Sequence, residues 1–329
     1  MSLTVASDAT MLIDSSFKPA WWLPSPHLQT LWPALFRRRV APDLDKERVE
    51  LSDGDFVDLC WSRKTDRPVV LVLHGLEGSV HSHYVGSLIV SLEIAGFRPV
   101  FMHFRGCSGE PNRLPRSYHS GDTGDLAHVV DHINQQAGQP LHAAVGFSLG
   151  GNVLLKWLGQ TGASNPLHYG VAVSVPFLLA DAANRLESGL SHLYEIHLMK
   201  SLKRSYATKF ERIESPLDVD IDQLKGFWDF DDRVTAPLHG FNSVTHYYTE
   251  SSCRQYLKGI KIPTRIIHAL DDPFMFPDTV PDTYEISESV ELLLARNGGH
   301  VGFVSGKYPW KPEDWYERRI IEFLDDGVR

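Results

Sequence analysis

Short hydrophobic runs alternate with longer amphipathic segments through much of the chain, the pattern of a sheet built from crossover units. Continuous apolar runs predict buried strands, and apolar residues at three- and four-residue spacing predict helices. The predicted strands cover residues 48–51, 56–61, 69–73, 99–104, 141–145, 169–175, 264–269 and 290–295. The predicted helices cover residues 84–95, 125–136 and about 313–324, with another directly after residue 148. This order favours an α/β protein with a mostly parallel central sheet and helices on both faces.

The alternation stops between Pro176 and Pro263. This stretch has helical spacing of apolar residues around Leu193 and a group of aromatic residues around Trp228, but no clear strand. We interpret residues 177–262 as a helical insertion that caps the carboxyl edge of the sheet, hereafter the insertion. The core of the fold is then expected to comprise residues 46–176 and 263–329.

The first 45 residues are predicted to form an arm packed on this core. Residues 17–36 are rich in aromatic residues and proline, including Trp21, Trp22 and Trp32. Because proline interrupts helices, we expect an extended segment with one or two helical turns, which buries its tryptophans against the core.

Composition indicates an ordinary globular protein and disfavours several classes of partner. The net charge of −9 argues against binding to nucleic acid or to an anionic membrane surface. No stretch has the length and hydrophobicity of a secretory leader or a bilayer span, so no stable membrane anchor is expected. The three cysteines are widely spaced and suit a reducing compartment, which favours the cytoplasm.

One pentapeptide carries the clearest chemical signal. In Gly146-Phe147-Ser148-Leu149-Gly150, the serine lies where a buried strand turns directly into a helix. Glycines two residues before and after the serine remove Cβ atoms that would collide in such a turn, as in a nucleophile elbow. Ser148 is therefore the predicted nucleophile.

A serine hydroxyl needs a base and a group that orients the base. Later strands are followed by Asp271-Asp272-Pro273 and by Gly299-His300-Val301, in the order that such an elbow requires. We predict His300 as the base and Asp272 as its partner, since Asp272 stands directly before the turn proline. Asp271 remains the alternative for that role.

The oxyanion formed during acyl transfer needs preorganised N–H donors. We expect one from Leu149, at the start of the helix, and one from Leu76, in the glycine-containing loop after the strand at 69–73. His74 is interpreted as support for that loop.

Trp228, Phe230 and Tyr247 are candidates to line an acyl pocket. The histidines at 81, 83, 103 and 119 lack acidic or cysteine partners at ligand spacing, so neither a metal nor another cofactor is expected.

Several motifs together resemble the YheT-like branch of the α/β-hydrolase fold, which includes the plant EMB8-like proteins and eukaryotic α/β-hydrolase domain proteins. They are His27-Leu28-Gln29-Thr30-Leu31, His74-Gly75-Leu76-Glu77-Gly78, Arg105-Gly106-Cys107-Ser108-Gly109, the elbow, Phe230-Asp231-Asp232, Asp271-Asp272-Pro273-Phe274 and Gly299-His300-Val301-Gly302-Phe303. The resemblance implies a serine hydrolase with the triad Ser148, Asp272 and His300. Members of this branch are described as esterases, lipases or acyltransferases, often with medium-chain acyl substrates.

The residues and the resemblance together predict hydrolysis of short- to medium-chain carboxylic esters, with a small acyl ester as substrate. Transfer of the acyl group to an alcohol, or thioester hydrolysis, would use the same triad and remains an alternative. A ligand-binding protein that keeps the hydrolase shell is the alternative from another class.

Overall fold

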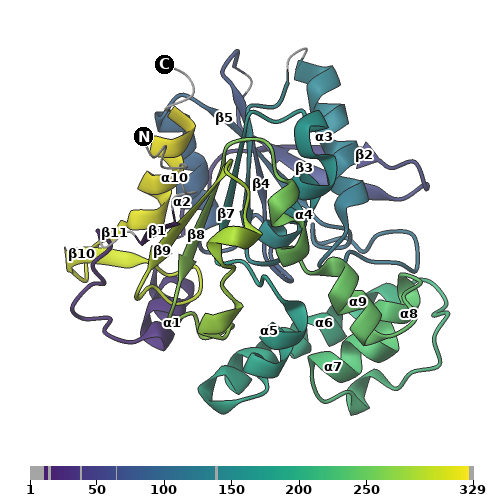
Figure 1. Cartoon of the computed structure of the whole chain (residues 1–329). Helices are drawn as coiled ribbons and strands as arrows, with labels where there is room; N and C mark the ends of the chain where they lie inside the picture. The colour runs from purple at the N-terminus through teal and green to yellow at the C-terminus, as the bar shows by residue number, and fades with distance from the viewer. Residues whose placement is uncertain (1–10, 14–15, 38, 64, 138–139, 326–329) are drawn as a thin grey trace, which may run out of the picture.

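The structure, a computed structural model, describes residues 11–13, 16–37, 39–63, 65–137 and 140–325. Its centre is a nine-stranded sheet in the order β1-β9-β8-β7-β6-β4-β5-β3-β2 (Figure 1). β3 pairs antiparallel with both of its neighbours, β2 and β5, and the other neighbouring strands of the sheet pair in parallel. Their bounds are β1 (Met11–Ile13), β2 (Asp45–Glu50), β3 (Phe56–Trp61), β4 (Val69–Leu73), β5 (Arg98–His103), β6 (Ala143–Phe147), β7 (Tyr169–Val173), β8 (Thr264–Ala269) and β9 (Val290–Ala295).

Helices cover both faces of this sheet. On one face, α2 (Val85–Ile94) and α10 (Trp315–Asp325) pack on one set of alternating strand residues, and on the other face α3 (Thr123–Ala137) and α4 (Leu149–Thr161) pack on the other set. In β4, for example, Leu71 and Leu73 belong to the α3/α4 cluster and Val70 and Val72 to the α2/α10 cluster. Both faces of the strand are therefore buried, which is why it reads as a continuous apolar run. The predicted fold class is confirmed.

The N-terminal arm differs from its prediction. Residues 26–36 form the eleven-residue helix α1 (Pro26–Phe36), although Pro33 lies within it. Pro26 occupies the first turn, where a missing N–H costs nothing, and Ser25 caps the helix through the Leu28 N–H. The expectation of an extended arm with one or two helical turns was wrong. The expectation that all its tryptophans are buried was also wrong, because Trp21 is 75% exposed.

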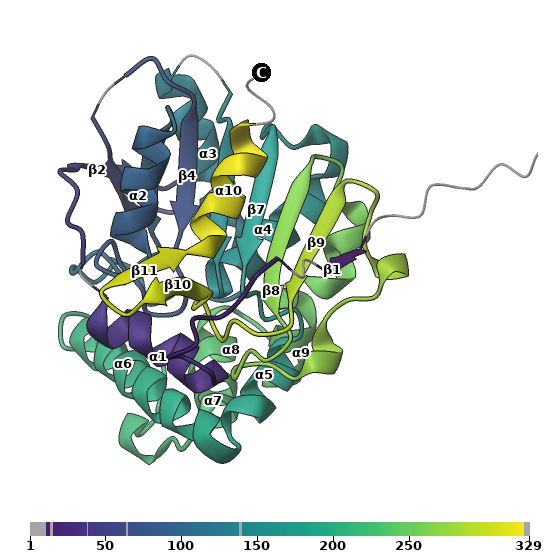
Figure 2. The same cartoon turned by 90° about the vertical axis from the view of Figure 1, so that its left-hand side faces the viewer.

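The sequence analysis did not predict three of the strands. The short β1 adds to the edge of the sheet beside β9, and β10 (Val304–Tyr308) pairs with β11 (Lys311–Asp314) as a separate antiparallel hairpin. The hairpin lies beside α1 and directly follows the loop that carries His300 (Figure 2).

The insertion is helical throughout its ordered elements. It contains α5 (Leu179–Leu186), α6 (His192–Phe210), α7 (Phe227–Phe230), a π-helical turn (Asp231–Thr235), α8 (Ala236–Leu238) and α9 (Val244–Ser251). Short 3-10 helices lie at Gly162–Ser164, Gly189–Ser191, Ile221–Gln223, Arg254–Gly259, Pro277–Thr279 and Thr283–Glu285.

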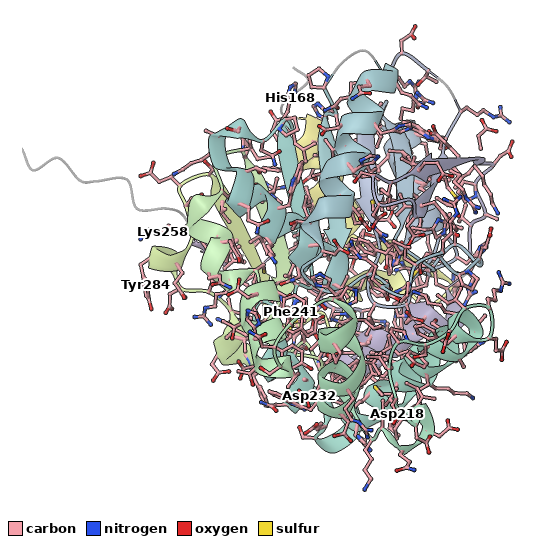
Figure 3. All side chains as sticks on the ribbon, turned by 90° about the vertical axis from the view of Figure 1, so that its right-hand side faces the viewer. His168, Asp218, Asp232, Phe241, Lys258 and Tyr284 are labelled. Carbon is pink, nitrogen blue, oxygen red and sulfur yellow. The ribbon has the colours of Figure 1, made fainter. Side chains whose placement is uncertain are left out.

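The insertion buries a hydrophobic cluster of its own, centred on Phe227, Phe230, Tyr247 and Tyr248. Figure 3 shows Asp218 and Asp232 at this end of the molecule, Phe241 nearer its middle, and His168, just before β7, at the other end. The last part of the predicted insertion packs differently, because Cys253, Leu257 and Ile260 join the main core under α4.

Among the described residues, no helix combines the length and hydrophobicity that crossing a bilayer requires.

Glu317 of α10 gives the fold a testable pH dependence. Burial, reinforced by the nearby Asp314 charge, raises the pKa of Glu317 from 4.5 to about 7. Between these two values the folded state binds more protons than the unfolded state, so this residue's contribution to stability is full below pH 4.5 and falls as the pH rises through 7. The loss amounts to about 3 kcal/mol at 1.36 kcal/mol for each pKa unit.

We therefore expect Glu317→Gln, which cannot ionise, to lack this pH dependence. Urea unfolding at a series of pH values should show the free energy of unfolding of E317Q rising relative to wild type by about 3 kcal/mol between pH 4 and pH 8. A difference between the two proteins that stays constant over this range would contradict the assignment.

Candidate active site

Ser148 lies at the turn between β6 and α4 in a strained conformation. Its φ of 50° and ψ of −119° are unusual for a residue with a side chain, and its N–H donates to Val173 O at 2.8 Å. The flanking glycines are required by close contacts: a Cβ on Gly146 would lie 2.5 Å from Gly150 O, and one on Gly150 would lie 2.5 Å from His74 O. The turn therefore has the geometry of a nucleophile elbow.

The structure brings Ser148, His300 and Asp272 together in one hydrogen-bonded chain. His300 Nε2 lies 3.1 Å from Ser148 Oγ, and His300 Nδ1 lies 2.8 Å from Asp272 Oδ2. This arrangement suits a neutral imidazole that donates from Nδ1 to the carboxylate and accepts at Nε2 from the hydroxyl. Asp272 and His300 are both buried, so their interaction is shielded from bulk water.

The two adjacent aspartates have different partners. Asp272 accepts from His300 and from the Phe274 N–H, whereas Asp271 accepts from the Gly299 N–H at 3.0 Å and from the Asn297 side chain. Asp271 thus ties together the loop that carries the histidine, and Asp272 contacts the imidazole. Burial raises the pKa of Asp271, and the hydrogen bonds from the loop oppose that rise.

Phe274 lies flat on the imidazole of His300. The two rings are stacked with centroids 3.9 Å apart and planes 3° from parallel. Because Phe274 also donates its N–H to Asp272, one residue fixes both the plane of the His300 imidazole and the position of the Asp272 carboxylate. The sequence analysis quoted Phe274 within a motif but gave it no role.

The loop after β4 brings the Leu76 amide close to Ser148. A Cβ on Gly75 would lie 3.2 Å from Ser148 Cβ, so this loop runs against the serine. The amides on either side of Leu76 are occupied: Gly75 N–H donates to Tyr84 Oη and Glu77 N–H to Tyr118 Oη. The Leu76 N–H has no acceptor among the residues that the structure describes.

The second expected donor also has no intrahelical acceptor. Leu149 is the first residue of α4, where backbone N–H groups have no carbonyl four residues earlier in the helix. The positive end of the helix dipole adds to the attraction for a negative oxygen at this position. Both amides are thus available next to Ser148.

His74 supports the same loop. Its Nδ1–H donates to Gly75 O at 2.6 Å, and its Nε2 accepts from Phe104 N–H at 3.1 Å. Complete burial lowers the pKa of His74 to about 3, so the ring stays neutral and holds both bonds at physiological pH. This arrangement matches the supporting role that the sequence analysis gave it.

The insertion contacts the loop after β4 directly. Ser205 of α6 donates to the carboxylate of Glu77, whose other oxygen accepts from Tyr118 Oη. Leu76 and Phe274 also pack against the hydrophobic cluster of the insertion. The insertion therefore contacts both the loop after β4 and the ring that stacks on His300.

The three aromatic residues predicted for an acyl pocket lie within the insertion. Phe230 and Tyr247 are buried in its cluster, and Tyr247 Oη accepts from the Ser120 N–H. Trp228 borders a cavity of about 280 Å³ whose lining also includes Leu178 and Tyr248 but none of Ser148, Asp272 and His300. No hydrogen bond or ring contact within the described parts of the chain joins these three aromatic residues to that trio.

Comparison with known proteins identifies the family of the chain and its relatives within that family. The family described as alpha/beta hydrolase fold matches residues 68–307. The chain is 40% identical to the candidate esterase YheT of Escherichia coli (strain K12), over 98% of this chain and 97% of that protein. It is 30% identical to the phospholipase ABHD3 of Mus musculus, over 92% of this chain and 76% of that protein.

The solved structure of the Pyrococcus furiosus esterase Pf2001 has a similar fold. It superimposes with a TM-score of 0.56 and 19% identity, over 86% of this chain and 92% of that one. With a family match over most of its length and a 40% identical relative, the chain belongs to the alpha/beta hydrolase fold family, in the branch that includes YheT.

Proposed function

We propose that the protein is a serine hydrolase that cleaves carboxylic esters through an acyl-enzyme on Ser148. The observation that carries this proposal is the hydrogen-bonded chain from Ser148 Oγ through His300 to Asp272, beside the backbone amides of Leu76 and Leu149. The names of the relatives, an esterase candidate and a phospholipase, support ester chemistry.

In the first half of the proposed reaction, His300 Nε2 takes the proton of Ser148 as Oγ attacks the ester carbonyl. The tetrahedral oxyanion accepts from the Leu76 and Leu149 N–H groups. Asp272 holds the imidazole in the tautomer that accepts at Nε2 and stabilises the imidazolium. When the carbonyl re-forms, the alcohol leaves with the proton from His300, and Ser148 carries the acyl group.

In the second half, water takes the place of the alcohol. His300 removes a proton from the water as it attacks the acyl carbon, and a second tetrahedral oxyanion forms at the same two amides. Collapse of this intermediate returns the proton from His300 to Ser148 Oγ and releases the carboxylic acid.

We further propose that the insertion acts as a cap that limits the length of the acyl chain. The support is that Leu76, which offers one of the two amides, also packs against the cluster of the insertion. An acyl group attached to Ser148 would therefore meet apolar side chains from both parts. Trp228, Phe230 and Tyr247 would act through this cluster, since Phe230 and Tyr247 are buried within it.

A series of p-nitrophenyl esters from acetate to palmitate tests this function. We expect kcat/KM to rise from acetate to a short or medium chain and then to fall, because longer chains exceed the space under the insertion. Added glycerol shows by product analysis whether an alcohol competes with water for the acyl group. Tight binding of an ester without turnover of any member of the series would contradict the proposal.

A further inference from the structure

Two adjacent polar side chains of α1 are buried against the loop that carries His300. Gln29 is 1% exposed and Thr30 is 8% exposed, although α1 lies at the surface of the molecule (Figure 2). Buried polar groups are stabilised when their hydrogen bonds are satisfied, so the partners of these two side chains indicate what they do.

Thr30 binds the backbone of His300 itself. Its Oγ1 donates to Pro26 O, one turn earlier in α1, at 2.8 Å and accepts from the His300 N–H at 2.9 Å. The first bond uses the only hydrogen of the hydroxyl and so turns a lone pair toward the His300 amide. Thr30 thereby fixes the main chain from which the imidazole extends toward Ser148.

Gln29 binds the far end of the same loop through both backbone groups of Val304. Its Oε1 accepts from the Val304 N–H at 2.8 Å, and its Nε2 donates to Val304 O at 3.1 Å and to Leu23 O at 3.2 Å. These bonds resemble those of a neighbouring strand and hold α1 in register with the loop.

The loop between these two contacts is strained. Val301 has a φ of 52° and Phe303 a φ of 45°. Residues other than glycine rarely adopt such values, and β-branched residues such as valine do so least of all. Such conformations are energetically unfavourable and persist only where surrounding contacts hold them. The Val301 N–H is held by Ser174 Oγ and the Phe303 N–H by Gly298 O.

The backbone of α1 approaches this loop too closely for side chains between them. A Cβ on Gly299 would lie 2.5 Å from Pro26 O, and one on Gly302 would lie 2.5 Å from Gln29 O. Pro33 has no N–H to donate to Gln29 O, so the proline within α1 leaves that carbonyl facing the loop.

We propose that Thr30 is a positioning residue for His300: its hydroxyl, presented by α1, sets the loop so that the imidazole reaches Ser148 and Asp272 together. The inference rests on the proposed function, because it concerns the geometry of the same base. It assigns the N-terminal arm a role in the chemistry that lies beyond packing.

Thr30→Val, which keeps the shape of the side chain and removes the hydroxyl, tests the role. With p-nitrophenyl butyrate at 15 °C, we expect kcat to fall about 10- to 100-fold, because a small displacement of a catalytic group has effects of this size. KM should change little, because the Thr30 hydroxyl binds main-chain groups of Pro26 and His300 and acts through the position of the imidazole. Thr30→Ser, which keeps the hydroxyl, should restore kcat to near the wild-type value.

Thr161→Val is the matched control. Thr161 also donates to a carbonyl one turn earlier, Trp157 O, and accepts from another group, Asn165 Nδ2, but it lies at the far end of α4. This variant should lose stability while kcat stays unchanged. If T30V does not accumulate, Thr30→Ala replaces it with the same expected loss.

The low-field proton resonance of His300 Nδ1–H, in the bond to Asp272, gives a readout that does not depend on turnover. We expect it in wild type and T30S, and we expect it to broaden or vanish in T30V. Folded T30V with wild-type kcat, or with an unchanged resonance, would overturn the role of Thr30. If wild type hydrolyses no ester, the proposed function fails, and the resonance still tests the positioning.

Discussion

Ser148→Ala is expected to abolish ester hydrolysis. Removing the hydroxyl removes the atom that accepts the acyl group, and losses on the order of 10⁶-fold in kcat accompany such a change in serine hydrolases. The Ser148 side chain is only partly buried and its Oγ contacts His300, so alanine leaves no large cavity. The measurement is kcat for p-nitrophenyl butyrate with purified protein.

Ser201→Ala in α6 is the matched control for this substitution. Its hydroxyl donates to His197 O, within its own helix, so activity should stay at the wild-type value. Thermal unfolding of both variants shows whether any loss comes from misfolding. Wild-type activity in folded S148A would rule out the acyl-enzyme on this residue.

The second large effect is expected at Asp272. Asp272→Asn keeps the size of the side chain but no longer favours the imidazole tautomer that accepts at Nε2, and kcat should fall on the order of 10⁴-fold. Asp271→Asn is the built-in comparison. Its Oδ1 can still accept from Gly299 N–H, so we expect only a small loss of kcat.

The ratio of these two losses decides between the adjacent carboxylates. Measured side by side on one ester, kcat should be far lower for D272N than for D271N. The reverse order would assign the orienting role to Asp271, and the bond between Asp272 and His300 would then have no catalytic meaning.

The core strands could be predicted because each is buried on both faces. β3, β4, β8 and β9 have the predicted bounds, since a continuous apolar run leaves little doubt about where the strand ends. The first predicted strand began three residues late because Asp45, Lys46 and Glu47 are polar and belong to the edge strand β2. An edge strand has no second neighbour to bury it, so its pattern is weak.

Helix α1 could not be predicted from its own residues. Pro33 disfavours a helix locally, and the cost is offset by contacts with residues about 270 positions later in the chain, such as the bond from His300 N–H to Thr30 Oγ1. No local pattern contains that information. The motif around Gln29 and Thr30 was visible in the sequence, but only the fold shows which atoms it contacts.

The sequence predicted part of the candidate site. Ser148, Asp272 and His300 follow strands whose carboxyl ends meet at one edge, so their approach follows from the topology. Phe274 and Tyr118 were not assigned, because a stacked ring and a hydroxyl that binds a distant amide leave no spacing signal. The aromatic residues of the insertion were visible, but their burial in its own cluster was not.

The most direct measurement is the identity and rate of covalent labelling by a fluorophosphonate, read by tandem mass spectrometry. Our account predicts a single stoichiometric adduct on Ser148, formed rapidly in wild type and far more slowly in His300→Gln, because the base that activates the hydroxyl is gone. An adduct on another residue, or labelling of Ser148 at the wild-type rate without His300, would contradict it.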